Sequence, residues 1–177
     1  MADLKEEVDA IARGDSAAFR RLVLATSPKL VRLAARITGS VEDGEDVVQE
    51  AYVKAHRALV DGRFDRRSRI ETWLYRIVAN SAIDALRAGA KRPKSIETIP
   101  EPAWDGAGAA EARVALVELD ELLGGLPHDQ RAALVLKGVE GLSSSEIAEI
   151  MDTTEGAVEQ RLVRARATLK EWGRTNE

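Results

Sequence analysis

Apolar residues recur at helical spacing along most of the chain, and no strong period-two run marks a strand. Leu30, Leu33 and Ile37 follow one another at intervals of three and four residues, which places them on one face of a helix. Comparable patterns run through residues 42–58 and 70–88. The first half of the chain therefore predicts a set of packed helices.

The helical periodicity stops between Gly89 and Glu111, where proline and glycine are frequent instead. A stretch of that length without regular elements is uncommon inside one compact domain. We therefore expect a first domain at 1–90, a flexible linker at 91–112 and a second domain at 113–177.

The second domain carries the pattern of a helix-turn-helix. Ser143 and Glu146 have the spacing of a capping box that opens a short helix. Asp152 interrupts the apolar pattern, and Thr153 or Thr154 is placed to cap a longer helix. The apolar face of that longer helix consists of Val158, Leu162, Ala165 and Leu169. The expected fold class is all-α, with two small helical domains and a helix-turn-helix in the C-terminal one.

Composition alone argues against a nucleic-acid-binding protein, because the 177 residues carry a formal net charge of −4. The charge is unevenly distributed, however. Residues 63–94 contain nine basic and three acidic side chains, whereas residues 95–125 contain one basic and seven acidic side chains. The hydrophobic fraction of 45% and charged fraction of 32% are otherwise those of an ordinary globular protein.

The sequence lacks the signature motifs of several classes of protein function. The chain has no cysteine, no phosphate-binding or dinucleotide-binding glycine motif and no zinc-protease motif. Its two histidines, His56 and His128, lie far apart in the sequence. We expect no catalytic residue, cofactor or metal site. No apolar run approaches the roughly 20 residues of a membrane helix, and the N-terminus lacks a signal-peptide pattern, so we expect a cytoplasmic protein.

The basic segment is also rich in aromatic residues, a combination that suits single-stranded DNA because unpaired bases stack on flat side chains. On a helix, Ile83 would share one stripe with Arg76, Asn80 and Arg87. Alternatively, Trp73 and Tyr75 serve the core. The candidate DNA contacts are Arg63, Phe64, Arg66, Trp73, Arg76, Asn80 and Arg87.

The second helix of the helix-turn-helix carries polar side chains that could read duplex DNA, because arginine forks match guanine edges and phosphates. A solvated charged face is the alternative. The candidates are Glu155, Gln160, Arg161, Arg164 and Arg166.

An acidic cluster opens the helix expected at 42–58. Acidic residues at a helix start stabilise the helix dipole, which is a structural role. Asp46, Gln49 and Glu50 also share a helical face that could dock on a basic partner.

Together these segments resemble a bacterial RNA polymerase sigma factor of the extracytoplasmic-function (ECF) group, over nearly the whole chain. Residues 42–59 are similar to that family's polymerase-binding helix. Residues 69–92, with the motif WLYRI, are similar to its minus-ten recognition helix. Residues 126–171 are similar to its fourth region.

The resemblance implies a division of labour. Asp46, Val47, Gln49 and Glu50 would bind the clamp helices of core RNA polymerase, and the polymerase flap would be a second contact. The segment Gly62 to Glu71 would capture a flipped minus-ten base. Arg76, Asn80 and Arg87 would contact the non-template strand, and the helix from Glu155 to Lys170 would enter the minus-thirty-five major groove. The expected partners are core RNA polymerase, promoter DNA and an anti-sigma factor, without membrane insertion.

Two rival interpretations remain open on the sequence: a stand-alone helix-turn-helix regulator, and a helical protein-interaction module. Several positions also depart from the usual family pattern. Ile70 and Glu71 stand where the family often has an aromatic and a basic residue. Asp152 stands where the turn commonly has glycine, and Glu159 stands where a basic residue is frequent. These departures bear on promoter sequence rather than on the class.

Overall fold

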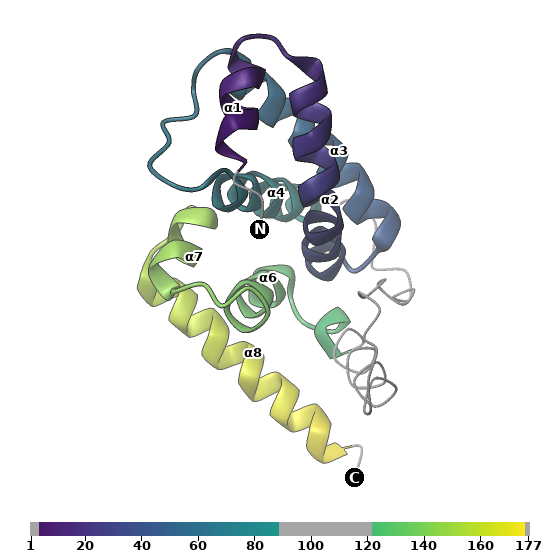
Figure 1. Cartoon of the computed structure of the whole chain (residues 1–177). Helices are drawn as coiled ribbons and strands as arrows, with labels where there is room; N and C mark the ends of the chain where they lie inside the picture. The colour runs from purple at the N-terminus through teal and green to yellow at the C-terminus, as the bar shows by residue number, and fades with distance from the viewer. Residues whose placement is uncertain (1–3, 89–121, 176–177) are drawn as a thin grey trace, which may run out of the picture.

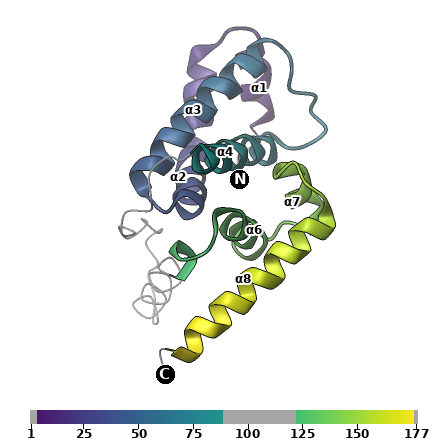
Figure 2. The same cartoon turned by 180° about the vertical axis from the view of Figure 1, so that it is seen from behind.

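The computed structural model describes residues 4–88 and 122–175, and every regular element in those ranges is a helix (Figures 1 and 2). The predicted all-α class with two helical units is confirmed. The first unit contains α1 (Lys5–Ala12), α2 (Ser16–Thr38), α3 (Val41–Val60) and α4 (Ile70–Arg87). The second contains α6 (His128–Gly138), α7 (Ser144–Ile150) and α8 (Glu155–Thr175). The predicted linker at 91–112 lies outside the described residues.

Local signals set the ends of the helices in the first unit. Asp15 caps α2 by accepting hydrogen bonds from the backbone N–H groups of the next turn. Gly39 ends α2 in the left-handed conformation, with φ of 87°, and Ser40 then caps α3. Gly44 lets α3 approach α2 closely, because a Cβ there would lie 2.7 Å from the backbone nitrogen of Ala35.

The apolar faces of α1 to α4 meet in one core. Its fully buried side chains include Ile11, Leu22, Leu33, Ile37 and Leu74. A polar contact ties α2 to α3 within it, where the hydroxyls of Thr26 and Tyr52 lie 2.7 Å apart. This packing fixes α3 and α4 on a common support.

The second unit is a helix-turn-helix built on α6. The predicted capping box is present, with the Ser143 side chain accepting from the backbone N–H of Glu146 and the Glu146 carboxylate accepting from that of Ser143. Thr154 caps α8 by accepting from the N–H of Ala157. Asp152 in the turn adopts a left-handed backbone with φ of 48°, which is the conformation that a glycine favours.

The two units pack against each other. Helix α6 contacts α2 and α4, and α7 contacts α4, while α8 extends away toward the C-terminus (Figures 1 and 2). Arg131 of α6 is 1% exposed, and its Nε donates to the carbonyl of Arg36 in the last turn of α2. A cation suits that position because the last carbonyls of a helix carry negative partial charge. No local sequence pattern predicted this contact.

Candidate nucleic-acid interface

The predicted polymerase-binding residues of α3 divide between surface and core. Asp46, Gln49 and Glu50 are exposed. They fall within an arc of about 100° on an ideal helix, which turns by about 100° per residue. Val47 is 5% exposed and belongs to the apolar core, so the prediction that its side chain joins this surface is corrected. Val47 supports the face from beneath.

An exposed apolar residue, which the sequence analysis missed, completes this face. Val53 is 51% exposed and lies four residues after Gln49, on the same side of α3. The four-residue spacing to Gln49 was the available signal for Val53. We call Asp46, Gln49, Glu50 and Val53 the α3 face.

The segment between α3 and α4 brings its arginines into ion pairs. Arg66 pairs with Asp9 of α1, and Arg69 pairs with Glu71 at 3.2 Å. Arg63 and Arg67 pair with Asp61 and Asp65. These pairs are largely exposed and each contributes little to stability. Of these pairs, Arg66–Asp9 joins the loop to α1, and Arg69–Glu71 joins it to the start of α4.

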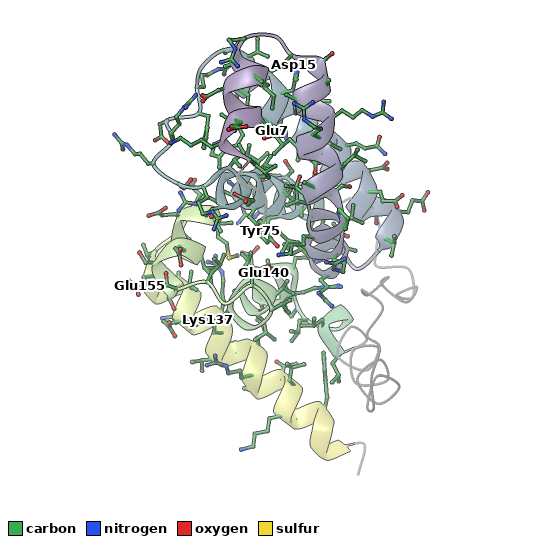
Figure 3. The ribbon with its side chains drawn as sticks, viewed as in Figure 1. Glu7, Asp15, Tyr75, Lys137, Glu140 and Glu155 are labelled. Carbon is green, nitrogen blue, oxygen red and sulfur yellow. The ribbon has the colours of Figure 1, made fainter. Side chains whose placement is uncertain are left out.

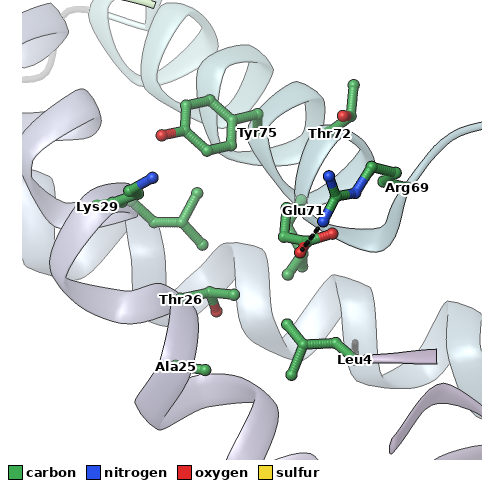
Figure 4. A pocket seen from close by; sticks show the side chains of 10 residues that line it. Leu4, Ala25, Thr26, Lys29, Arg69, Glu71, Thr72 and Tyr75 are labelled. Carbon is green, nitrogen blue, oxygen red and sulfur yellow. Dashed lines mark hydrogen bonds and ion pairs between the residues drawn. The ribbon is translucent and has the colours of Figure 1, made fainter. Parts of the chain in front are cut away.

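Two neighbouring cavities lie beside this loop. One of about 370 Å³ is lined by α1 and by the loop, including Val8, Phe64 and Arg66. The other, of about 320 Å³, lies between α2 and α4. Figure 4 shows the Arg69–Glu71 pair at its edge, with Lys29 of α2 and Tyr75 of α4 also lining it. Cavities of this size fit small ligands or a single base.

The aromatic residues of the basic segment take two separate roles. Phe64 and Trp73 form a pair with ring centroids 5.0 Å apart, half-buried at the base of the loop. Tyr75 instead points toward the second unit, where its hydroxyl hydrogen bonds with Glu140 (Figure 3). Burial raises the pKa of Tyr75, and the nearby Glu140 carboxylate raises that pKa further.

The Glu140 carboxyl is itself perturbed. Burial raises its pKa, partly opposed by the Tyr75 hydrogen bond and by the cations Arg36, Lys29 and Arg32 of α2. A carboxyl group of the second unit therefore faces a basic side of the first.

Two arginines of the predicted stripe on α4 pair with the second unit. Arg76 pairs with Glu149 of α7 at 2.9 Å, and Arg87 pairs with Asp129 of α6 at 3.7 Å. Asn80 is exposed. Ile83 is 2% exposed, so its expected place in an accessible stripe is corrected: it belongs to the core.

The five candidates on α8 do not share one face. Gln160 and Arg164, four residues apart, lie on the exposed side, where Val163 is also 62% exposed. Glu155 and Arg166 are exposed but lie on a flank, three turns apart. Arg161 is turned toward α6, where it pairs with Asp129 at 3.2 Å.

Glu159, one of the departures noted in the sequence, also has an internal partner. The Ser144 hydroxyl at the start of α7 donates a hydrogen bond to its carboxylate. Glu159 therefore braces the two helices of the helix-turn-helix together.

Comparison with known proteins identifies the family. The sequence model of the family Sigma-70 region 2 matches residues 22–92, and that of the family Sigma-70 region 4 matches residues 116–169. The ECF RNA polymerase sigma-E factor of Escherichia coli K12 is 38% identical, with 92% of this chain and 90% of that protein covered. The chain is a sigma factor of the sigma-70 family, ECF group. It directs promoter-specific initiation of transcription.

Other similar proteins agree with this assignment. The sigma factor is 37% identical to the RNA polymerase sigma-H factor of Pseudomonas aeruginosa, over 92% of this chain and 89% of that one. Its fold resembles CnrH in complex with the cytosolic domain of CnrY, with a TM-score of 0.67, 29% identity and full coverage of both chains. It also resembles the sigma factor RpoE in complex with the anti-sigma factor NepR from Bartonella quintana, with a TM-score of 0.67 and 25% identity over 90% and 98% of the two chains.

Within the described ranges, no cluster of three or more His, Asp or Glu side chains could hold a metal ion. None of the helices described for this sigma factor combines the length and apolar character that crossing a membrane requires.

Proposed function

We propose that this sigma factor binds core RNA polymerase through the α3 face and reads promoters with two separate surfaces. The loop at 62–69 and α4 would take the minus-ten element, and α8 would take the minus-thirty-five element. One observation supports this assignment above the others: base-sized cavities and a Phe64–Trp73 pair lie beside a loop with several arginines.

The α3 face has the chemistry of a docking surface. Its acidic side chains Asp46 and Glu50 suit a basic partner helix, and the exposed side chain of Val53 supplies apolar area. Charged groups steer an encounter, whereas a buried apolar contact lengthens the life of a complex. A mixed face of this kind fits the polymerase clamp helices.

The loop and α4 would trap bases rather than open DNA unaided. Separating stacked base pairs costs about 1.4 kcal/mol per step. Stacking on an aromatic side chain returns about 1–3 kcal/mol for each captured base. With a single half-buried aromatic pair at the loop, capture of one or two bases offsets only part of the cost, and polymerase must supply the rest.

On α8 we infer that Gln160 and Arg164 approach base edges, since they share the exposed side. Arg166 and Glu155 would lie nearer the backbone. Arg161 would act mainly by positioning α8 on α6 through Asp129.

An anti-sigma factor is a proposed third partner, because the similar structure of RpoE contains one. We further propose that the protein works in the cytoplasm by binding alone, without catalysing a reaction of its own.

Reconstituted transcription with core polymerase and a randomised promoter library would test the proposed function. We expect transcripts only when the sigma factor is added, and enriched promoters with two conserved elements. Specific binding of the free chain to a duplex, with no transcripts above those of core polymerase alone, would instead support a stand-alone regulator.

A further inference from the structure

The cavity of about 320 Å³ between α2 and α4 has an apolar interior. Its lining includes the buried side chains of Leu4, Leu30 and Leu74. Thr26 also lines it, but the Thr26 hydroxyl is already engaged, since it donates to a carbonyl of its own helix at 2.8 Å and lies 2.7 Å from the hydroxyl of Tyr52. The inner part of the α2–α4 cavity therefore presents mainly carbon atoms.

The opening of the same cavity carries an excess of positive charge (Figure 4). Arg69 and Glu71 neutralise each other there through their pair at 3.2 Å. Lys29 is exposed, and no carboxylate among the described residues forms an ion pair with it. Glu140 lies near enough to interact with the Lys29 charge, but it faces two arginines of α2 as well. Lys29 is therefore the cation that a ligand at this opening would meet.

The neighbouring cavity beside the loop differs in its lining. It offers the ring of Phe64 together with Arg66 and Arg67, which is the combination of flat and cationic groups that suits a base and its phosphate. Among the described residues that line the α2–α4 cavity, Tyr75 is the only aromatic one, and its hydroxyl bonds to Glu140. The loop cavity is thus the better match for a base, and the α2–α4 cavity calls for a different ligand.

We propose that the α2–α4 cavity binds a compact organic acid, with the apolar body of the ligand against Leu30 and Leu74 and its carboxylate paired with Lys29. Burial of the apolar body supplies affinity, and the ammonium–carboxylate hydrogen bond fixes the orientation of the ligand. The volume lies at the lower end of the range for small-molecule sites, which favours a ligand of about ten non-hydrogen atoms. The side chains of Arg69 and Glu71 line both cavities, so the bound acid would lie beside the proposed base site.

Phenylacetate is a suitable probe, because it joins one carboxylate to a small apolar ring. Binding to the full chain can be followed by NMR of labelled leucine methyl groups, without polymerase or DNA. We expect saturable binding with a dissociation constant of about 1 mM or tighter, the range open to so small a ligand. Nuclear Overhauser contacts should connect the ring protons of phenylacetate with the methyl groups of Leu30 and Leu74.

The role of Lys29 is tested by changing the charge on each side of the proposed contact. Lys29→Gln should weaken phenylacetate binding about three- to tenfold, as expected for a partly solvated charged hydrogen bond. The neutral analogue phenylacetamide should bind the unsubstituted chain more weakly by a similar factor and should be insensitive to Lys29→Gln. Lys54→Gln is the matched control, because it removes the same charge from an exposed position of α3 outside the cavity.

A cavity-filling variant tests the location independently of charge. Ala25 lines the cavity and is itself exposed, so Ala25→Phe can place a ring over the opening without disturbing the core. We expect this variant to lose saturable binding of phenylacetate. Ala17→Phe, at an exposed position of the same helix outside the cavity, should bind phenylacetate as the unsubstituted chain does.

Three results would overturn the proposed site: no saturable binding, contacts to leucines outside the cavity, or equal affinity of phenylacetate and phenylacetamide. Thymidine monophosphate serves as a competing probe, and tighter binding of this nucleotide at Leu30 and Leu74 would assign the cavity to DNA instead. None of these measurements depends on transcription. Failure of the acid site therefore leaves the proposed promoter function standing, and the reverse also holds.

Discussion

Gly44 lies in the acidic start of α3, where the helix crosses α2, and Gly44→Ala tests how closely the two helices are packed. A Cβ at this position would lie 2.7 Å from the nitrogen of Ala35 and 2.9 Å from its Cα. Both atoms are backbone, so rotation of a side chain cannot relieve the overlap. The helices would have to move apart, which would disturb the support of the α3 face.

Two opposing terms set the expected magnitude. Alanine is better than glycine inside a helix by roughly 0.5–1 kcal/mol. Inserting a methyl group into a close-packed contact costs about 1–3 kcal/mol. Because the contact is with backbone, we expect the second term to dominate, with a net loss of about 1–2 kcal/mol. For a protein of this size that lowers the melting temperature by about 2–8 °C.

Thermal unfolding followed by circular dichroism measures this loss, and Gly138→Ala is the matched control. A Cβ at Gly138, the last residue of α6, meets nothing within 4 Å, and Gly138 has no positive φ. The same substitution should therefore leave stability unchanged or raise it slightly. The reasoning would be refuted if Gly44→Ala melted at or above the temperature of the unsubstituted protein.

Four further predictions concern the interfaces. Asp46→Arg should weaken core-polymerase binding by reversing a charge on the α3 face; unchanged retention in a pull-down would exclude that contact. Asn80→Ala should lower run-off transcription and leave polymerase binding intact, and equal transcript levels would remove Asn80 from the minus-ten surface. Arg164→Ala should change the minus-thirty-five preference in a promoter library. Arg161→Ala should chiefly lower thermal stability, because the Arg161 guanidinium pairs with Asp129. A changed promoter preference for Arg161→Ala and a lowered stability for Arg164→Ala would exchange the two roles. Burial raises the pKa of Glu140, so the folded protein binds a proton on this carboxyl group more tightly than the unfolded chain does. The stability that this protonation contributes is lost as pH rises from about 4.3, the ordinary carboxyl pKa, through the raised pKa of the folded protein. Glu140→Gln should show a smaller fall in melting temperature over that pH range, and an identical fall would exclude Glu140 as its source.

Local signals made much of the secondary structure predictable. The stop at Gly39, the capping box of Ser143 and Glu146, and the start of α6 after Pro127 are each set by residues a few positions apart. Such signals act through backbone hydrogen bonds within one turn, so the sequence alone contains them.

The predictions for Val47 and Ile83 were wrong because spacing alone does not show which flank of a helix meets the core. Val47 and Ile83 sit at the edge of polar stripes, and spacing alone places them with their exposed neighbours. The internal partner of Arg161 was equally out of reach, since Asp129 lies 32 residues away. The contact of Arg131 with Arg36 spans 95 residues and joins two units, which no local pattern predicts.

The pairing of arginines with the protein's own acids bears on promoter specificity. Non-specific DNA affinity grows with the number of phosphates that free cations neutralise, and a genome offers a vast excess of non-specific sites. In this chain Arg63, Arg66 and Arg69 are engaged by acids near the loop, and Arg76 and Arg87 by acids of the second unit. Exposed pairs of this kind are weak enough for a well-placed phosphate to replace them. We therefore expect the acidity that first argued against DNA binding to reduce binding at wrong sites, where no matched contact replaces these ion pairs.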